Sequence, residues 1–168
     1  MTGMSRVCLR ALDPTDPDDL AAVVAAAVAG AVPSEVMPPD DAPDPDEWTV
    51  VRERAYARFL RSRPSDETSW LVVEGAAVVG VARLRHGAAG AETGVWLVRS
   101  ARGRGVGTTV LGLLVERAAA AGAQRLVADT TADNVAALGS LRRHGAALRA
   151  QGDDVAAVVE LRARGSSR

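Results

Sequence analysis

Lysine is absent from this chain of 168 residues, and arginine supplies all 20 of its basic side chains. Together with the excess of alanine, this indicates the coding bias of a GC-rich genome rather than a functional choice. Cysteine is nearly absent as well, since Cys8 is the only one. An intrachain disulfide is therefore excluded and a reducing compartment is expected. Cys8 itself is expected to be a small apolar residue in a buried strand.

The sequence also lacks any run of roughly 18 apolar residues, the length that a membrane-spanning helix needs. The run that comes closest, residues 20–32, follows three aspartates and contains Gly30, which indicates a helix of a globular protein and not a signal peptide. A net charge of −1 gives no reason to expect nucleic acid or an anionic membrane as a partner. We expect a cytoplasmic protein with one domain over residues 1–168.

Charge is distributed unevenly along the chain. The acidic residues of one short segment are Asp40, Asp41, Asp44, Asp46 and Glu47. Basic residues gather in a glycine-rich segment and in a later helix, at Arg99, Arg102, Arg104, Arg142 and Arg143. This predicts a front that attracts cations and a back that binds anions, although a solvated loop with a helix cap also explains the acidic run.

Hydrophobic periodicity and turn signals predict alternating strands and helices. Strands are expected at residues 7–12, 70–74, 77–84, 91–98, 125–130 and 155–161, and helices at 17–30, 105–121 and 134–144. Residues 32–45 contain five of the eight prolines and are expected to be a loop. After this loop, Asp46 is expected to cap a further helix. One face of that helix is expected to be buried by Trp48, Val51, Ala55 and Phe59.

The segment from Arg102 to Thr108, RGRGVGT, joins a predicted strand to a predicted helix. The start of a helix presents unpaired backbone N–H groups and a partial positive charge, which suits phosphate. Glycines let the backbone approach an anion closely, and the arginines add donors beyond what a connecting turn requires. A P-loop is excluded because Gly107 stands where its lysine would be. A dinucleotide-binding G-x-G-x-x-G is excluded because Thr108 or Val110 stands at its last position.

The same segment resembles the (Q/R)-x-x-G-x-(G/A) motif of the GNAT superfamily of acetyltransferases, at Arg102, Gly105 and Gly107. Residues 91–97, AETGVWL, resemble the AEIGYWL strand of its ribosomal-protein N-terminal acetyltransferase-like branch. Residues 134–146 are similar to the N-x-x-S-x-x-x-L-x-x-x-G-F helix of that branch. The resemblance implies an α+β fold of the GNAT type. Its mixed, mostly antiparallel sheet is flanked by helices, and a splayed central strand pair forms the acyl-CoA cleft.

The resemblance implies an acetyl-CoA-dependent N-acyltransferase that acetylates a primary amine, on a small molecule or a protein N-terminus. The amine would attack acetyl-CoA directly in a ternary complex, and no metal is expected. Two alternatives stay open, namely a non-catalytic acyl-CoA-binding regulatory module and an acyltransferase that uses a longer acyl-CoA. The sequence identifies neither the acceptor nor the oligomeric state, for which a homodimer is one option.

The resemblance also implies which residues bind acetyl-CoA. Leu97 and Val98 would line the pantetheine, where a backbone N–H would polarise the thioester carbonyl. Asn134 would hold the pantetheine arm. Arg142 and Arg143 would reach the phosphate of the adenosine ribose, with a solvated helix face as the alternative. The pyrophosphate would be bound by Arg102, Gly103, Arg104, Gly105, Val106, Gly107 and Thr108.

Four residues depart from the family pattern. Arg99 replaces a proline, Ala137 a serine and Ala146 a phenylalanine. Leu141 stands where many members have the tyrosine that protonates the departing thiolate, although the branch itself often has leucine there. Because of this last departure, the sequence does not identify the group that protonates the departing thiolate.

A base is also required, because an amine is protonated at pH 7 and must lose a proton before it attacks. Glu92 is the candidate base, since it begins the strand that splays from its neighbour. His86, at the end of the preceding strand, is the second candidate, because histidine is the side chain most often used as a general base near neutral pH. The alternatives are an ordinary acid at a strand edge and a solvated turn histidine.

Overall fold

The computed structural model describes residues 6–41 and 43–161. The strands are β1 Val7–Ala11, β2 Glu67–Glu74, β3 Ala77–Gly87, β4 Gly90–Leu97, β5 Arg125–Thr131, β6 Ala147–Gln151 and β7 Asp154–Glu160. The helices are α1 Pro17–Gly30, α2 Pro33–Val36, α3 Val50–Arg61, α4 Val106–Ala120 and α5 Val135–Arg143, with a 3-10 turn at Arg99–Ala101.

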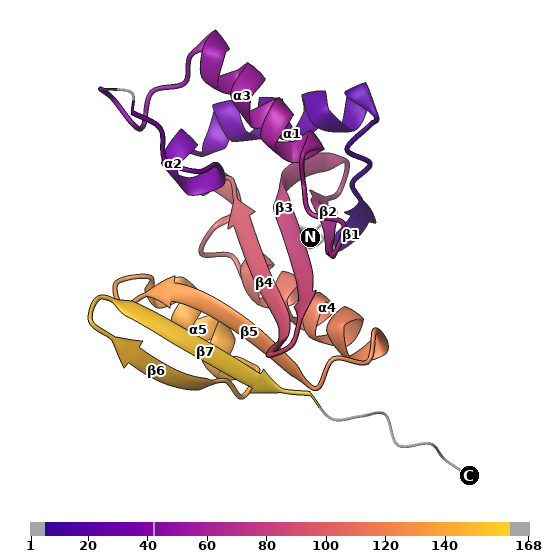
Figure 1. Cartoon of the computed structure of the whole chain (residues 1–168), viewed down its shortest axis with the longest axis vertical. Coiled ribbons are helices and arrows are strands. Elements are labelled where there is room, and N and C mark those ends of the chain that lie inside the picture. The colour runs from indigo at the N-terminus through magenta and orange to yellow at the C-terminus, as the bar shows by residue number, and fades with distance from the viewer. Residues whose placement is uncertain (1–5, 42, 162–168) are drawn as a thin grey trace, which may run out of the picture.

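The strands form one sheet in the order β1-β2-β3-β4-β5-β7-β6 (Figure 1). Neighbouring strands are antiparallel except β4 and β5, which are parallel. The predicted α+β class with a mixed, mostly antiparallel sheet is therefore confirmed. Within the described ranges, no helix is both long and apolar enough to cross a membrane.

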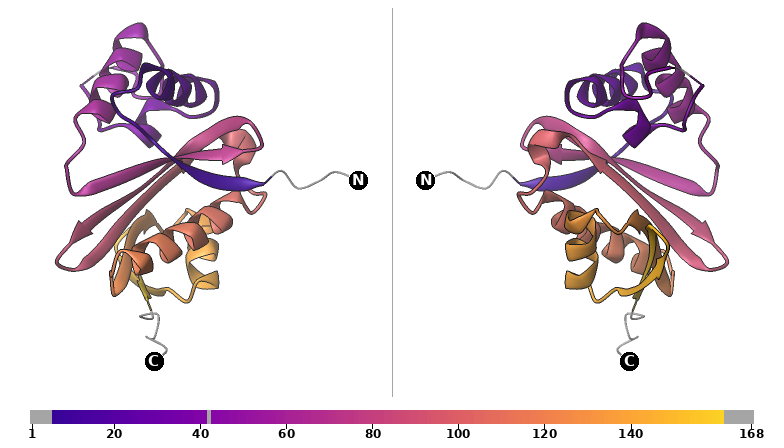
Figure 2. Two further views of the ribbon diagram at one scale, coloured as in Figure 1. Left: turned by 90° about the vertical axis from the view of Figure 1, so that its right-hand side faces the viewer. Right: turned by 90° about the vertical axis from the view of Figure 1, so that its left-hand side faces the viewer.

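Helices cover both faces of the first four strands, and the two faces have separate cores (Figure 2). On one face, α1 and α3 bury Val23, Tyr56 and Leu60 against Leu71 of β2. On the other face, α4 packs Val110 and other apolar residues against the strands. Because side chains alternate along a strand, β2 contributes to both cores.

The parallel strands β4 and β5 pair only near their starts. The register joins Ala91 to Leu126 and Glu92 to Val127. Beyond these pairs the two strands diverge (Figure 1). The expected splay of the central pair is confirmed, and it leaves the second half of β4 with a free edge toward β5.

The helix after the proline-rich loop differs from the prediction. It begins at Val50 and is capped by Thr49, whose hydroxyl accepts from the N–H of Arg52, so Asp46 is not the cap. The predicted buried stripe is wrong as well, because Val51 is 71% exposed. The buried face instead carries Arg52, Tyr56 and Leu60.

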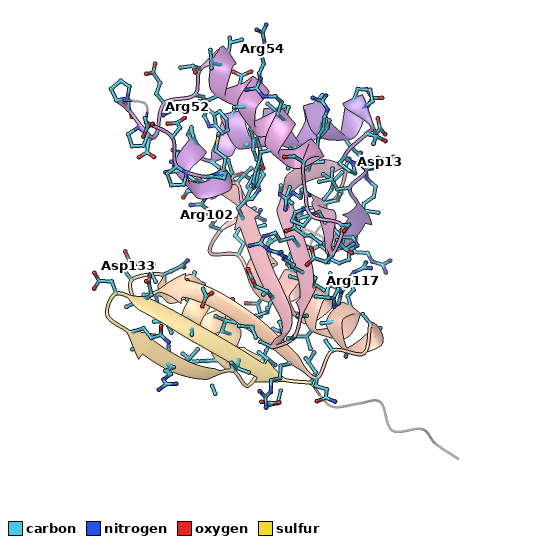
Figure 3. All side chains as sticks on the ribbon, viewed as in Figure 1. Asp13, Arg52, Arg54, Arg102, Arg117 and Asp133 are labelled. Atoms are coloured by element: carbon cyan, nitrogen blue, oxygen red, sulfur yellow. The ribbon has the colours of Figure 1, made fainter. Side chains whose placement is uncertain are left out.

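Arg52 explains this rotation of the helix. Its guanidinium is buried and donates to both carboxylate oxygens of Asp40, at 2.9 and 2.7 Å. It also donates to the backbone carbonyls of Asp44 and Glu47, and it lies beside the loop before α3 (Figure 3). The acidic segment is thus folded around one cation, which accounts for part of its charge locally.

Three smaller differences complete the comparison. The short helix α2 lies within the segment expected to be a loop. Strand β6 was not predicted. Cys8 is exposed rather than buried, because β1 is an edge strand and Leu9 is its buried residue.

Candidate active site

The divergence of β4 and β5 opens a cleft of about 730 Å³. Its walls are the second half of β4, the glycine-rich loop before α4, the end of β5 and helix α5. Two apolar side chains in this cleft are unusually exposed for their type, Val95 at 41% and Val135 at 73%. They offer an apolar surface to a bound molecule.

The loop before α4 presents a continuous row of backbone donors. Gly103 and Gly105 have φ values of +71° and +84°, a left-handed conformation that glycine adopts without strain. Thr109 is the first residue of the helix whose N–H donates along it, to Gly105 at 3.1 Å. The N–H groups of residues 103–108 have no acceptor within the part of the chain that the structure describes. Such a row at a helix start suits a phosphate group.

The side chain of Arg102 forms three hydrogen bonds to other residues of the chain. Its Nε donates to the carbonyl of Leu97 at 2.9 Å, and its two terminal nitrogens donate to the carboxylate of Glu35 at 3.0 and 3.1 Å. Arg102 therefore lies beside α2 (Figure 3). It borders the cleft and joins the loop to α2 and to the end of β4.

The side chain of Arg104 forms its hydrogen bonds away from the cleft. It donates to both carboxylate oxygens of Glu74, at 2.9 and 2.7 Å, and to the carbonyl of Ser100 at 2.9 Å. These bonds lower the pKa of the Glu74 carboxyl. Arg104 does not line the cleft. The donors that face the cleft from this loop are thus mainly backbone N–H groups and not the two guanidinium groups.

The other predicted CoA-binding residues fall into two groups. Leu97, Asn134 and Thr108 line the cleft with the loop glycines Gly103, Gly105 and Gly107. Val98 and Val106 are buried beneath it, and Arg142 is exposed outside it. Arg143, the other arginine expected at the ribose phosphate, lines the cleft.

Helix α5 positions two groups that the cleft can use. Asn134 caps the helix, since its carbonyl oxygen accepts from the N–H of Ala137 at 3.1 Å, and its amide nitrogen remains at the cleft. Ser140, which the sequence did not single out, also lines the cleft, and its hydroxyl lies 2.8 Å from that of Thr108 on α4. Leu141 is buried, so its side chain contributes packing.

The chain's single tyrosine lies elsewhere. Tyr56 is fully buried on α3, in the core on the opposite face of the sheet from α4. Burial raises the pKa of its phenol. Tyr56 therefore cannot take the place of the tyrosine that many family members have at the position of Leu141.

A second cleft of about 520 Å³ lies on the other side of β4. The two clefts share four residues, Glu35, Gly94, Val95 and Trp96. Glu92 lines this second cleft and not the first. Its side chain is 50% exposed, and its ion-pair partner is Arg83 at 3.5 Å. His86 is exposed and lines neither cleft.

Of the charged residues that line the second cleft, the sequence indicated only Glu92. Glu35 and Glu67 come from α2 and β2, and neither stands in a motif. Arg83 could have been found from the sequence. Val81, Arg83 and Arg85 share one face of β3, and this face changes from apolar to charged along the strand. A charged end of an otherwise buried strand face is typical of a cleft wall.

A splayed parallel strand pair, with a helix start rich in free N–H groups beside it, defines the class of acyl-CoA-dependent transferases. The chain belongs to the GNAT acetyltransferases, because the model of the acetyltransferase (GNAT) domain matches residues 6–147. Acetyl-CoA is the cosubstrate of this family's reaction.

Solved structures of acetyltransferases share the fold. RimL, a ribosomal L7/L12 α-N-protein acetyltransferase solved with coenzyme A, is 20% identical with a TM-score of 0.69, over 96% of this chain and 97% of that one. The N-acetyltransferase PseH of Campylobacter jejuni, solved with acetyl coenzyme A, is 13% identical with a TM-score of 0.67, over 94% and 100%.

A third similar structure is the dodecameric spermidine N-acetyltransferase of Vibrio cholerae. It is 13% identical with a TM-score of 0.65, over 92% of this chain and 94% of that one. A comparison with curated proteins gives no match. At these identities the structures show the fold and leave the acceptor of this chain undetermined.

Proposed function

We propose that the chain transfers the acetyl group of acetyl-CoA to a primary amine, by direct attack of the amine on the thioester in a ternary complex. One observation carries this proposal. The two clefts meet along Gly94, Val95 and Trp96 of β4. Two substrates bound in them would therefore face each other across one strand, and direct transfer needs the reacting atoms about 3–3.5 Å apart.

The first cleft suits acetyl-CoA. The N–H groups of residues 103–108 would bind the pyrophosphate, with the helix start adding favourable charge. The exposed Val95 and Val135 would contact the pantetheine, and the amide nitrogen of Asn134 would donate to it. A backbone N–H on the free edge of β4 would polarise the thioester carbonyl and stabilise the oxyanion.

The second cleft supplies the base. Glu92 lines it, is half exposed, and is held only by a long contact with Arg83. It would take the proton of the ammonium group, directly or through water, and the free amine would then attack the thioester carbon. The carbon–sulfur bond breaks and CoA leaves as a thiolate, while the attacking nitrogen loses its remaining extra proton to water. Water would protonate the thiolate and a backbone N–H would assist its departure by a hydrogen bond, since Leu141 offers no hydroxyl.

Initial-rate kinetics with both substrates varied test direct transfer. A ternary complex gives double-reciprocal lines that intersect, and mass spectrometry of the protein with acetyl-CoA alone should show no acetyl adduct. Parallel lines together with an acetylated protein would indicate a covalent intermediate and would contradict direct attack.

Three further expectations remain predictions, namely a location in the cytoplasm, a single domain and a homodimer.

A further inference from the structure

The charges that line the second cleft are balanced. Its carboxylates are Glu35, Glu67 and Glu92, and its guanidinium groups are Arg63, Arg83 and Arg85. A surplus of carboxylates, which would attract an amine with several positive charges, does not occur among the described residues of this wall. A ligand that carries one charge of each sign suits such a wall better than a polycation does.

Each of these carboxylates already has an arginine partner. Glu35 is held by Arg102 at 3.0 Å, and Glu67 is ion-paired with Arg63. Arg83 lies between the remaining oxygens, 3.4 Å from Glu67 and 3.5 Å from Glu92. An ammonium ion that enters alone would compete with Arg83 for Glu92 and leave that arginine with less compensation.

Arg83 is held more loosely than the other paired arginines. Among the described residues, the six arginine–carboxylate pairs that involve neither Arg83 nor Glu67 have distances from 2.7 to 3.1 Å. The side chain of Arg83 is 31% exposed and borders the cleft. Its two long contacts therefore leave it able to bind a further anion.

The absence of a side chain at Gly94 leaves room for the guanidinium of Arg83. A Cβ atom at residue 94 would lie 2.6 Å from Nε of Arg83 and 3.1 Å from its Cζ. The guanidinium thus lies over β4 at one of the residues that the two clefts share. It borders the stretch of β4 along which the two clefts meet.

We propose, as an extension of the proposed function, that the acceptor is a small amino acid whose carboxylate binds to Arg83. The carboxylate would replace the two long contacts of Arg83, while Glu67 keeps Arg63 and Glu92 is released. In an α-amino acid the amine lies one carbon from the carboxylate, which would bring it next to Glu92. Every charge then has a partner, and Glu92 is free to accept the proton.

Matched substrates test this inference. The common L-amino acids are compared with their C-terminal carboxamides, which keep the amine and side chain and lose the carboxylate. The wild type should show a kcat/KM for the best free amino acid that exceeds that of its amide by about tenfold to a hundredfold, the range for a charge-assisted hydrogen bond. Butylamine and spermidine serve as amines without a carboxylate.

Two variants locate the preference. Arg83→Gln should lower kcat/KM for the free amino acid by the same factor and leave the amide nearly unchanged. Arg85→Gln is the matched control, because Arg85 lines the same cleft but is paired with Asp66 at 3.1 Å. That variant should keep the preference. Melting temperature and CoA affinity confirm that each variant is folded.

The outcomes separate this inference from the proposed function. If amides, butylamine or spermidine are acetylated as well as the free amino acids, the inference is wrong while the proposed function stands. If Arg83→Gln keeps the preference in a folded protein, Arg83 is not the carboxylate site. If CoA binds but no amine is acetylated, the proposed function fails, and the inference with it.

Discussion

Arg102 and Glu35 form a two-point ion pair, with nitrogen–oxygen distances of 3.0 and 3.1 Å, across 67 residues of sequence. The pair joins the loop that we propose to bind acetyl-CoA to α2, which borders both clefts. We therefore expect Arg102 to act on CoA binding mainly by holding the loop in place, since three of its N–H groups donate to Glu35 and to the carbonyl of Leu97.

This arrangement predicts that Arg102→Ala and Glu35→Gln weaken CoA binding together. Each change should cost about 1 kcal/mol, below the usual range for a charged hydrogen bond because the pair is partly exposed to solvent. The double variant should lose no more than Arg102→Ala alone, because both changes remove one interaction. Calorimetric titration with CoA measures all three.

Arg125→Ala is the control for these titrations, because it removes an exposed ion pair with Glu160. Arg125 lies at the start of β5, the end of the β4–β5 pair that is opposite the cleft. It should leave CoA affinity unchanged. A large loss in Arg102→Ala with none in Glu35→Gln would instead mean that Arg102 binds a phosphate directly.

The same pair predicts a dependence of stability on pH. The hydrogen bonds from Arg102 hold the pKa of the Glu35 carboxyl below its ordinary value of 4.5, with the Val32 N–H and nearby arginine charges adding to them. A carboxyl with a lowered pKa stabilises the fold above its unfolded-state pKa, and this is lost as the pH falls through the folded-state value. Glu35→Gln should therefore be less stable than the wild type near neutral pH, by roughly 0.2–1 kcal/mol.

Thermal melts followed by circular dichroism measure this difference across pH. It should be constant above pH 4.5 and should disappear as the pH falls well below that value. A difference that persists unchanged in acid would show that Glu35 stabilises the fold by something other than its charge.

Gly105 should be required by its backbone conformation. Its φ of +84° is unfavourable for residues with a Cβ atom, while no heavy atom lies within 4 Å of such an atom among the described residues. Gly105→Ala should therefore cost about 1–2 kcal/mol of stability and turn the loop donors away from the phosphate. Calorimetry should show CoA affinity reduced by about tenfold or more.

Gly152→Ala is the matched control, because Gly152 has a φ of +66° in the turn between β6 and β7 and an equally open surrounding. It should lose similar stability and keep its CoA affinity. Equal loss of CoA affinity in both variants would mean that the effect comes from general destabilisation.

Much of the fold could be predicted, because its signals are local. Asp16 followed by Pro17 marks the start of α1, and Gly75 with φ of +65° marks the hairpin of β2 and β3. The loop from Gly103 to Gly105 was found because its glycines serve both the turn and the anion. Strand β6 was missed because a short, exposed edge strand carries little hydrophobic pattern.

The roles of charged residues could not be predicted as well. The motif presents Arg102 as a phosphate ligand, and nothing near it in sequence shows that Glu35 occupies its guanidinium. The buried face of α3 was misjudged for a similar reason. The apolar spacing of Trp48, Val51, Ala55 and Phe59 gave no sign that the acidic loop supplies enough acceptors to bury Arg52.

Glu92→Gln should lower turnover by about 10²–10⁴-fold, the usual contribution of a positioned base. The rate optimum should move to higher pH, where the free amine forms without help, and CoA affinity should not change. His86→Gln is the control and should keep wild-type turnover, because His86 lines neither cleft. A Glu92→Gln protein with wild-type rates across the pH range would remove Glu92 from the mechanism.

The most direct test of the account is the rate at which the wild-type protein releases CoA thiol from acetyl-CoA, with and without each of a panel of primary amines. We predict release that saturates with an amine, together with that amine's acetylated product in the mass spectrum. CoA binding without amine-dependent release, over the whole panel, would contradict the account and would indicate a non-catalytic acyl-CoA-binding module.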